Sequence, residues 1–249
     1  MSCRRGAAAA ICVALCCVAL VAGDYQLPAG VKTCKKDGDD FSSCLRLAIQ
    51  ESWPVFIAGI PDLGLPALDP YFVETHLTTY DSGQLRGTLH ATNVNTYGFA
   101  KARFLSVKPE LNNDVFRLEI DVELPKLLIE GDYKADGSLG TFQIGGSGTF
   151  NISLDDVKTN WDITGHIVDD HWVVEHFRLT PEVGNLRLWF SDLFNGNEEM
   201  NRAAMYFANE YWPLIYRGML PKLIESWDTL LTEFVNRFFS KIAFSSVFP

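Results

Sequence analysis

The feature that most constrains this fold is a long amphipathic segment near the C-terminus, from Asn197 to Ser240. Its apolar residues recur at three- and four-residue steps, which is the period of a helix with one apolar face. A straight helix of this length would span about 65 Å, so the rest of the chain must supply a long apolar surface to cover it. Pro213 and Pro221 should bend or interrupt it, because proline lacks the backbone N–H and crowds the preceding turn. The apolar stripe comprises Met200, Ala204, Phe207, Tyr211, Leu214, Ile215, Leu220, Leu223, Ile224, Trp227, Leu230, Leu231, Phe234 and Phe238.

The middle of the chain has the pattern of β-strands. Residues 115–124 alternate apolar and charged side chains, which is typical of a sheet with one buried and one solvated face. Asp136-Gly137 predicts a hairpin turn, and the run Gly145–Gly148 predicts bulges or a sharp bend. Further strands are predicted at residues 72–80, 84–109, 126–134, 139–155, 158–168, 172–179 and 186–190.

A shorter helix precedes the strands. It is predicted from Phe41 to about Phe56, with Asp39 or Asp40 as its cap and a break near Pro54. The order is therefore helix, antiparallel strands and long helix. This order predicts an α+β fold in which a highly curved antiparallel sheet is rolled around the long C-terminal helix as a single module.

The N-terminus indicates the compartment. Arg4 and Arg5 precede an apolar run, Ala7–Ala22, which ends in small residues. This layout is typical of a secretory signal peptide, so we expect residues 1–23 to be removed and residues 24–249 to form a secreted, extracellular domain. No later stretch reaches 18 consecutive apolar residues, and we expect no stable membrane anchor.

Removal of the signal peptide changes both the cysteine count and the charge. Cys34 and Cys44 are the cysteines that remain, and in an oxidising compartment they are expected to form a disulfide. Without Arg4 and Arg5, 19 basic and 31 acidic residues give a net charge of −12. A chain this acidic, without a run of lysine or arginine, is a poor partner for nucleic acid or anionic membranes.

Residues suited to catalysis or metal binding are sparse. The Gly-Gly-Ser-Gly-Thr sequence at residues 145–149 lacks the final glycine of a nucleophile elbow. His166, His171 and His176 are five residues apart, and a tight hairpin at Asp169-Asp170 would put the first two on one face and His176 on the other. A metal would need a third convergent ligand. We therefore predict no enzyme activity, no metal and no cofactor.

One modification motif is present. Asn151-Ile152-Ser153 is an N-glycosylation acceptor sequence, which is used only in chains that enter the secretory pathway. Asn151 alternates with Phe150 and Ile152, so its side chain should face solvent if theirs face the core. We expect Asn151 to be available for glycosylation.

Several segments together resemble the insect secreted family of takeout and juvenile hormone-binding proteins. They occur in the family's order and cover nearly the whole predicted mature chain. The cysteine pair resembles the family's first disulfide, and the loop after the first helix resembles its proline-rich signature. The segments are Cys34 with Cys44, Gly59–Pro70, Leu124–Pro125, Gly131–Gly137, Gly145–Gly148, Phe194–Asn197, Asn236–Ile242 and Phe248–Pro249.

This resemblance implies a long helix wrapped by a highly curved antiparallel sheet, related to the tubular lipid-binding modules of the bactericidal/permeability-increasing class. It also implies an internal tunnel for an elongated apolar ligand. The hormone-binding branch usually carries a second disulfide, for which the predicted mature chain has no cysteines. The resemblance therefore favours the takeout branch and broad ligand selectivity over dedicated transport of juvenile hormone.

The sequence thus predicts a monomeric carrier that buries an apolar small molecule, such as a fatty acid or an isoprenoid ester. Each buried CH₂ contributes about 0.8 kcal/mol, and one polar group would orient the polar end of the ligand. The alternatives are a secreted interaction protein with a filled core that acts through an extracellular receptor, and a secreted hydrolase. The candidate tunnel residues, each also compatible with a plain hydrophobic core, are Trp53, Phe56, Leu118, Ile120, Val122, Phe142, Ile144, Trp161, Phe207, Trp212, Leu223 and Trp227.

Overall fold

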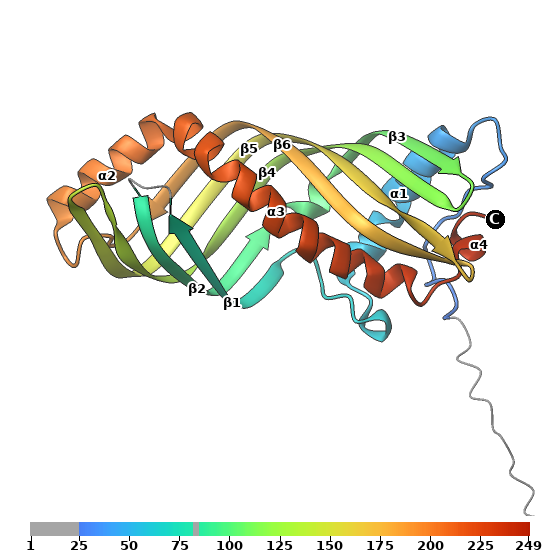
Figure 1. The fold of residues 1–249 in the computed structure, drawn as a ribbon, viewed down its shortest axis with the longest axis horizontal. Coiled ribbons are helices and arrows are strands. Elements are labelled where there is room, and N and C mark those ends of the chain that lie inside the picture. The colour runs from blue at the N-terminus through green and yellow to red at the C-terminus, as the bar shows by residue number, and fades with distance from the viewer. Residues whose placement is uncertain (1–24, 82–84) are drawn as a thin grey trace, which may run out of the picture.

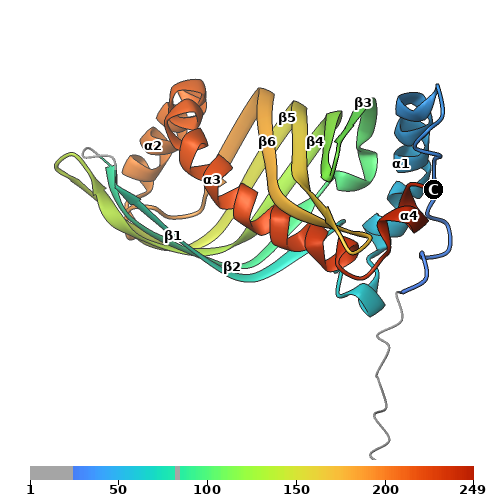
Figure 2. The same ribbon diagram turned by 45° about the vertical axis from the view of Figure 1, so that its right-hand side comes forward.

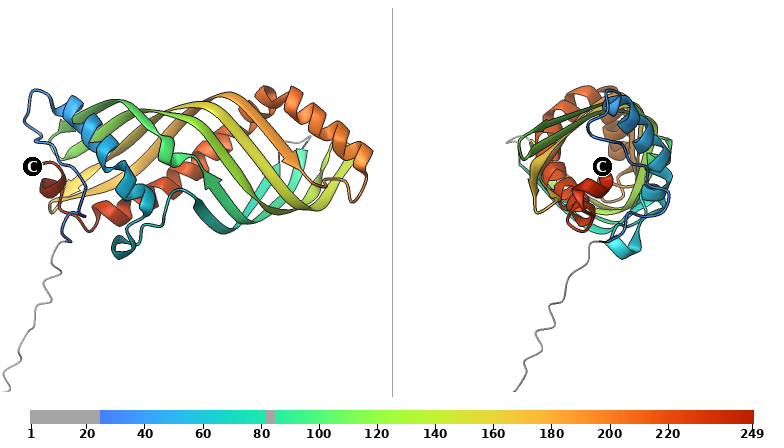
Figure 3. Two further views of the ribbon diagram at one scale, coloured as in Figure 1. Left: turned by 180° about the vertical axis from the view of Figure 1, so that it is seen from behind. Right: turned by 90° about the vertical axis from the view of Figure 1, so that its right-hand side faces the viewer.

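The structure is a computed structural model that describes residues 25–81 and 85–249; the predicted signal peptide lies outside this range. Six antiparallel strands curl into an elongated trough, and the C-terminal helices run along its length (Figure 1). Seen end-on, strands and helices surround the long axis (Figure 3). The predicted α+β fold, with a curved antiparallel sheet and a long C-terminal helix, is confirmed.

The sheet is built on two very long strands. Its order is β1-β2-β4-β5-β6, and β3 pairs with one end of β4. β4 and β5 contain 25 and 27 residues and pair with each other along their lengths. Each of them, like β6, joins two strands that the sequence predicts separately. The strands are β1 (Tyr71–Asp81), β2 (Leu85–Tyr97), β3 (Arg103–Asn112), β4 (Val115–Leu139), β5 (Phe142–Val168) and β6 (His171–Phe190).

The hairpin turn predicted at Asp136-Gly137 is wrong. β4 continues through both residues to Leu139, and the chain turns at residues 140–141. Gly137 lies opposite Gly87 of β2, and a Cβ on either glycine would collide with the backbone of the other strand. The glycine is therefore needed for close strand approach, and the dipeptide does not form a turn.

The bulges predicted at Gly145–Gly148 are also wrong, because the register between β4 and β5 is continuous across this run. A Cβ on Gly146 would collide with the backbone of Asp192, and one on Gly148 with the side chain of Ser191. The Gly145 N–H donates to the carbonyl oxygen of Leu193 at 2.9 Å. The glycines thus let the segment after β6 pack directly on β5.

A crease crosses the sheet where Pro125, Asp156 and Gly184 lie side by side on β4, β5 and β6. On one side of it, the even-numbered β4 residues from Phe116 to Leu124 are buried, and on the other side odd-numbered residues such as Leu127 pack inward. Asp156 has a φ of 53°, and only 2.9 Å separates its Cβ from the place where a Cβ on Gly184 would lie. Each strand therefore exchanges its inward and outward faces here.

The crease divides the concave face into two parts. The packed half runs from the crease to the turns at residues 113–114 and 169–170, and the distal half runs from the crease to the turn at residues 140–141. Helices α1 (Phe41–Ala58) and α4 (Phe244–Val247) lie at the end of the packed half, whereas α2 (Glu198–Glu210) lies at the distal end (Figure 2). Two short 3₁₀ helices span Pro61–Leu63 and Phe99–Lys101.

Prolines affect the helices in different ways. The predicted long helix is interrupted at Tyr211, so that Pro213 falls in the first turn of α3 (Trp212–Phe239), where its missing N–H removes no helical hydrogen bond. Pro221 lies inside α3 without interrupting it. The break predicted at Pro54 is wrong, because α1 continues to Ala58.

Packing accounts for the continuous α1. Trp53 and Phe56, on either side of Pro54, pack against Phe104 and Phe238, with ring centroids 5.2 and 5.5 Å apart. These contacts hold the last turn of α1 in place. At its other end, Asp40 occupies the N-cap position, but its side chain makes no capping hydrogen bond.

The packed half contains the main hydrophobic core. Phe116 is 1% exposed, and its ring lies 4.8 Å from that of Trp172 and 5.1 Å from those of Phe244 and Phe248. The predicted disulfide between Cys34 and Cys44 is present and joins the segment before α1 to its first turns. Cys34 is itself buried in this core. The N-terminal segment, α1, the end of α3 and α4 thus cover one half of the sheet.

Candidate functional site

The C-terminal helices bind the backbone edge of β6 with polar side chains. Asn236 accepts from the Val174 N–H at 2.9 Å and donates to its carbonyl oxygen at 2.7 Å. Asn209 does the same with Leu188, at 3.0 and 2.8 Å. An asparagine amide offers one donor side and one acceptor side, as a neighbouring strand would, so these residues protect an edge that would otherwise be open to pairing.

Three more residues extend this contact. Asp228 accepts from the Phe177 N–H at 2.8 Å, and Thr232 from the same N–H at 2.9 Å. Asn201 accepts from the Leu193 N–H at 3.0 Å. We call the five residues the edge seam: Asn201, Asn209, Asp228, Thr232 and Asn236.

Sequence reasoning missed the edge seam, because Asn209 and Asp228 lie outside the apolar stripe and polar residues outside such a stripe are expected to face solvent. A signal was available in the three asparagines. Asparagine has a low helix propensity, since its side chain competes for backbone hydrogen bonds. Three of them at inner positions of α2 and α3 therefore indicate a role outside the helix.

The edge seam fixes which side of α3 faces the sheet. Leu231, Val235 and Phe239 pack against the core of the packed half. Trp227 and Leu220 lie on the same face of α3 as Leu231, at steps of three and four residues. The apolar stripe therefore continues along the trough towards the distal half, where its members are only partly buried.

The inward side of the sheet shows the same change. In β4, Phe116, Leu118, Ile120, Val122 and Leu124 are 1–5% exposed. Beyond the crease, the next inward-facing apolar side chains, on β4 and β5, are partly exposed, and along β4 burial returns only at Tyr133, which is 3% exposed. Together with Trp161 and Val183, which are partly exposed on the packed side of the crease, and with residues 220–227 of α3, the partly exposed side chains form the distal apolar surface. This surface is our candidate site: Leu127, Ile129, Ile152, Leu154, Trp161, Val183, Leu220, Leu223, Ile224 and Trp227.

An aromatic row spans the concave face at the boundary of this surface. Phe104 of β3 lies between Trp53 of α1 and Trp161 of β5, with centroid distances of 5.2 and 5.8 Å. Trp161 continues the row to Phe177 of β6, 5.5 Å away. The Trp53 indole N–H donates to the carbonyl oxygen of Phe99 at 2.8 Å, so this row is held by both packing and a hydrogen bond.

The predicted tunnel residues separate into groups. Trp161, Leu223 and Trp227 belong to the distal apolar surface, and Trp53 and Phe56 lie beside it in partly buried positions. Leu118, Ile120 and Val122 are instead fully buried in the packed half. Trp212 is partly exposed and Phe207 is 51% exposed, both near the junction of α2 and α3. The side chain of Phe142 lies outside the described part of the structure, and contact of any of these residues with a ligand stays a prediction.

Few polar groups interrupt the inward face. Among the described residues, the buried side-chain atoms without a hydrogen-bond partner are the Thr159 hydroxyl and the Trp172 indole nitrogen. Thr159 lies on the inward face of β5, opposite Val122 of β4 and close to the crease. The Tyr216 hydroxyl of α3 donates to the carbonyl oxygen of Pro181 at 3.3 Å, and burial raises the pKa of Tyr216.

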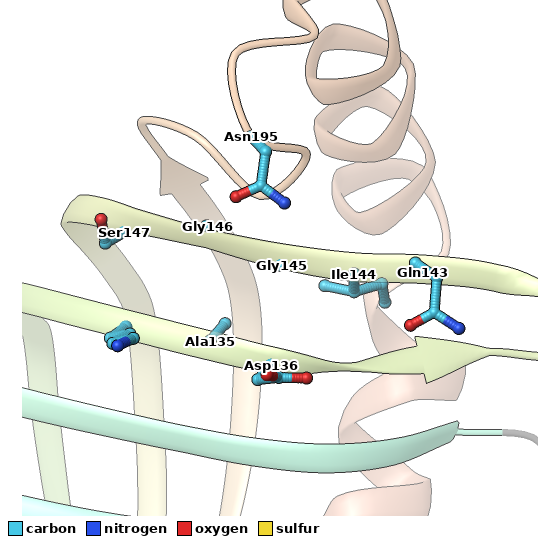
Figure 4. Close-up of a pocket in the computed structure, with 9 residues that line it drawn as sticks. Ala135, Asp136, Gln143, Ile144, Gly145, Gly146, Ser147 and Asn195 are labelled. Atoms are coloured by element: carbon cyan, nitrogen blue, oxygen red, sulfur yellow. The ribbon is translucent and has the colours of Figure 1, made fainter.

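A separate surface hollow of about 270 Å³ lies at the distal end (Figure 4). Asn195 lies above the strand that carries Gly145 and Gly146, and Asp136 lies on the neighbouring strand β4. Ile144 belongs to its lining. The hollow is small, polar and open, so it differs from what an elongated apolar ligand requires.

The three strand histidines bind different partners. His166 Nδ1 lies 3.0 Å from Asp114 Oδ2, a hydrogen bond that raises the pKa of His166 and lowers that of Asp114. His176 Nδ1 lies 2.9 Å from Asp228 Oδ2, and His171 Nδ1 lies 2.8 Å from the carbonyl oxygen of Asp169. Within the described ranges, no group of three or more potential metal ligands comes together.

The faces of these histidines differ from the prediction. A register shift between Thr164 and Gly165 places both Val174 and Phe177 inward. His176 therefore shares the outward face with His166 and His171. Simple alternation fails here, because the bulge inserts one extra residue in β6.

Comparison with known proteins agrees with this architecture. The sequence profile of the haemolymph juvenile hormone binding protein family matches residues 10–249. The circadian clock-controlled protein daywake of Drosophila melanogaster is 24% identical over 231 residues, which cover 89% of this chain and 88% of daywake. A putative beta-carotene-binding protein of Schistocerca gregaria is 21% identical over 225 residues, 88% of each chain.

The fold agrees with a solved structure as well. The crystal structure of Takeout 1 from Epiphyas postvittana superposes with a TM-score of 0.73 and covers 87% of this chain and 99% of its own, at 22% identity. Among residues 25–81 and 85–249, no helix combines the length and apolarity that a membrane crossing requires. The profile match, the relatives and the fold together place the chain: it belongs to the takeout and haemolymph juvenile hormone binding protein family.

Proposed function

We propose that this protein is a secreted carrier that holds an elongated apolar small molecule against the distal apolar surface. The observation that carries the proposal is the contrast along β4, whose inward residues are 1–5% exposed in the packed half, whereas Leu127 and Ile129, the first inward residues beyond the crease, are partly exposed. Apolar side chains on an inward face that helix and sheet cover only in part gain stability when a ligand completes their burial. Family membership and the name of the locust relative support a ligand of this class.

The mechanism is burial without bond chemistry. Each ligand CH₂ removed from water contributes about 0.8 kcal/mol, so affinity increases with chain length until the surface is covered. Trp161 and Trp227 are placed to contact the ligand from β5 and α3. Residues 1–23 act as the signal peptide in this proposal, and the disulfide between Cys34 and Cys44 is of the kind that persists outside the cell.

The test has two parts. Protein purified from the medium of secreting cells is extracted with organic solvent, and the extract is analysed by mass spectrometry for a long apolar molecule. Delipidated protein is then titrated with fatty acids of increasing length, with tryptophan fluorescence as the readout. We expect saturation near one ligand per chain and little effect of salt, because burial drives binding.

A negative result would support the alternative function. If the native protein yields no extractable lipid and the delipidated protein binds no fatty acid at micromolar concentration, the carrier function is wrong. The chain would then act as a secreted interaction protein through an extracellular receptor.

A further inference from the structure

A row of residues crosses the convex face of the distal half. Glu130 of β4, Asn151 of β5 and Trp189 of β6 are direct cross-strand partners. Directly opposite residues on one face have Cβ atoms about 4.5–5.5 Å apart. Trp189 faces outward, because its neighbours Leu188 and Phe190 alternate with it and the Phe190 ring lies 4.9 Å from Tyr133 in the inward cluster.

The exposure of Trp189 is unusual for so large a side chain. It is 51% exposed on the part of β6 beyond the crease, where the other outward residues, Asn185 and Arg187, are polar. Its indole therefore presents an apolar face to solvent directly beside Asn151. The indole is therefore accessible to a group that is attached to the convex face.

The amide of Asn151 is available for modification. Asn160, on the same strand, donates to Asp121 at 2.8 Å, and Asn185 of β6 donates to Asp155 at 3.2 Å. In the described part of the chain, the Asn151 side chain makes no hydrogen bond, so its modification would break no contact. Asn151-Ile152-Ser153 also has the acceptor sequence that N-glycosylation requires.

We propose that Asn151 carries an N-linked glycan whose first sugars pack on the exposed indole of Trp189. In the transfer step, Asn151 Nδ2 forms a bond to the anomeric carbon of a lipid-pyrophosphate-linked oligosaccharide. The bond from that carbon to the pyrophosphate oxygen breaks, the amide loses one proton, and the lipid pyrophosphate leaves. The C–H-rich face of N-acetylglucosamine then meets the electron-rich face of the indole.

The position on the convex face has a consequence for binding. The glycan and the distal apolar surface lie on opposite faces of the same strands, because Asn151 alternates with Ile152. Glycosylation therefore leaves the ligand surface uncovered. The inference rests on the secretion included in the proposed function, but it does not depend on which ligand is bound.

The experiment uses full-length protein secreted from a eukaryotic host, compared with Asn151→Gln, Ser153→Ala and the matched Ser153→Thr, which keeps the acceptor sequence. Intact mass is measured before and after treatment with peptide N-glycosidase. We expect a glycan mass on the natural chain and on Ser153→Thr, and none on the other two. Secreted natural protein without a glycan would overturn the proposal, and protein retained in the cell without a glycan would overturn both secretion and glycosylation.

Packing on the indole has its own readout. Oxidation of Trp189 by N-bromosuccinimide, followed by peptide mass spectrometry, should be at least threefold slower in glycosylated protein than in Ser153→Ala. Trp172, which is 0% exposed, serves as the internal control and should be protected in both. Equal Trp189 oxidation would overturn the packing. Fatty-acid titration of the same samples separates the proposals, because a protein that binds ligand but carries no glycan keeps the carrier function and loses this inference.

Discussion

The two halves of the concave face are built from the same strands and behave differently. In β4, Val122 is 1% exposed, whereas Leu127 and Ile129, beyond the crease, are partly exposed. Pairing of β4 with β5 continues through both halves. The difference lies in what covers the two halves. Helices α1 and α4 and the C-terminal end of α3 pack on the packed half, whereas α2 and the N-terminal part of α3 follow the β6 edge of the distal half.

This comparison shows that an alternating apolar pattern does not determine whether the inward residues form a packed core or a binding surface. Complete burial of a valine, leucine or isoleucine side chain stabilises a fold by about 1.5–3 kcal/mol. The packed half has gained this stabilisation from its helices. In the distal half, burial of the apolar side chains is incomplete. A ligand that covers the surface would supply the remaining stabilisation. The carrier function that we propose thus rests on incomplete burial on one side of the crease.

The largest expected effect is on the packed half. Phe116→Ala removes a ring that contacts Trp172, Phe244 and Phe248, and should lower the free energy of unfolding by about 3–5 kcal/mol. Trp227→Ala, in the distal half, removes a larger side chain but should cost less than half as much, because Trp227 is only partly buried. Urea denaturation of ligand-free protein measures both. Equal losses would show that the two halves are packed alike.

The edge seam allows the same substitution, asparagine to alanine, to be compared in the two halves. Asn236→Ala and Asn209→Ala each leave one N–H and one carbonyl of β6 without their partner, Val174 in the first case and Leu188 in the second. Each should cost about 1–3 kcal/mol, with the larger loss for Asn236, whose surroundings contain the buried Val174 and Phe238. Thermal unfolding of both variants is the measurement. A larger loss for Asn209 would contradict the assignment of the halves.

Ligand binding should depend on the distal half. Leu223→Asp places a carboxylate in the distal apolar surface, where a ligand would have to desolvate it. Fatty-acid affinity should fall at least tenfold, which corresponds to about 1.4 kcal/mol. Glu225→Ala is the matched control, because its ion pair with Lys222, at 2.8 Å, joins two largely exposed side chains and an exposed pair of this kind contributes little to stability. Unchanged affinity in Leu223→Asp would place the ligand elsewhere.

Much of the fold was predictable, because strict alternation in residues 115–124 and the helical stripe after residue 197 each have one structural solution. The errors have local causes. Asp136-Gly137 has the chemistry of a turn, but in the structure Gly137 serves the close approach of β2. The helix does not break at Pro54, because the tertiary packing of Trp53 and Phe56 outweighs the loss of the backbone hydrogen bond that proline cannot donate.

The candidate site was harder to predict. Leu118, Ile120 and Val122 alternate at even positions and Leu127 and Ile129 at odd positions, so the sequence shows neither that the two sets face the same way nor which of them a helix covers. That depends on the position of the crease and on the edge seam. Both are tertiary features, and neither has a signature in hydrophobic periodicity.

The smallest expected effect lies at the boundary between the halves. The Thr159 hydroxyl is buried beside the crease without a hydrogen-bond partner among the described residues, and such a group costs about 1–3 kcal/mol relative to a bonded one. Thr159→Val keeps the shape and removes the hydroxyl, so stability should be unchanged or rise by up to about 1 kcal/mol. Thr159→Ser keeps the hydroxyl and removes a methyl group, and should lower stability by about 1 kcal/mol. Urea denaturation measures the change in the free energy of unfolding for both variants, and we expect the two changes to have opposite signs. A loss of stability in Thr159→Val would mean that water reaches this hydroxyl. The water-free core of the packed half would then not extend as far as Thr159.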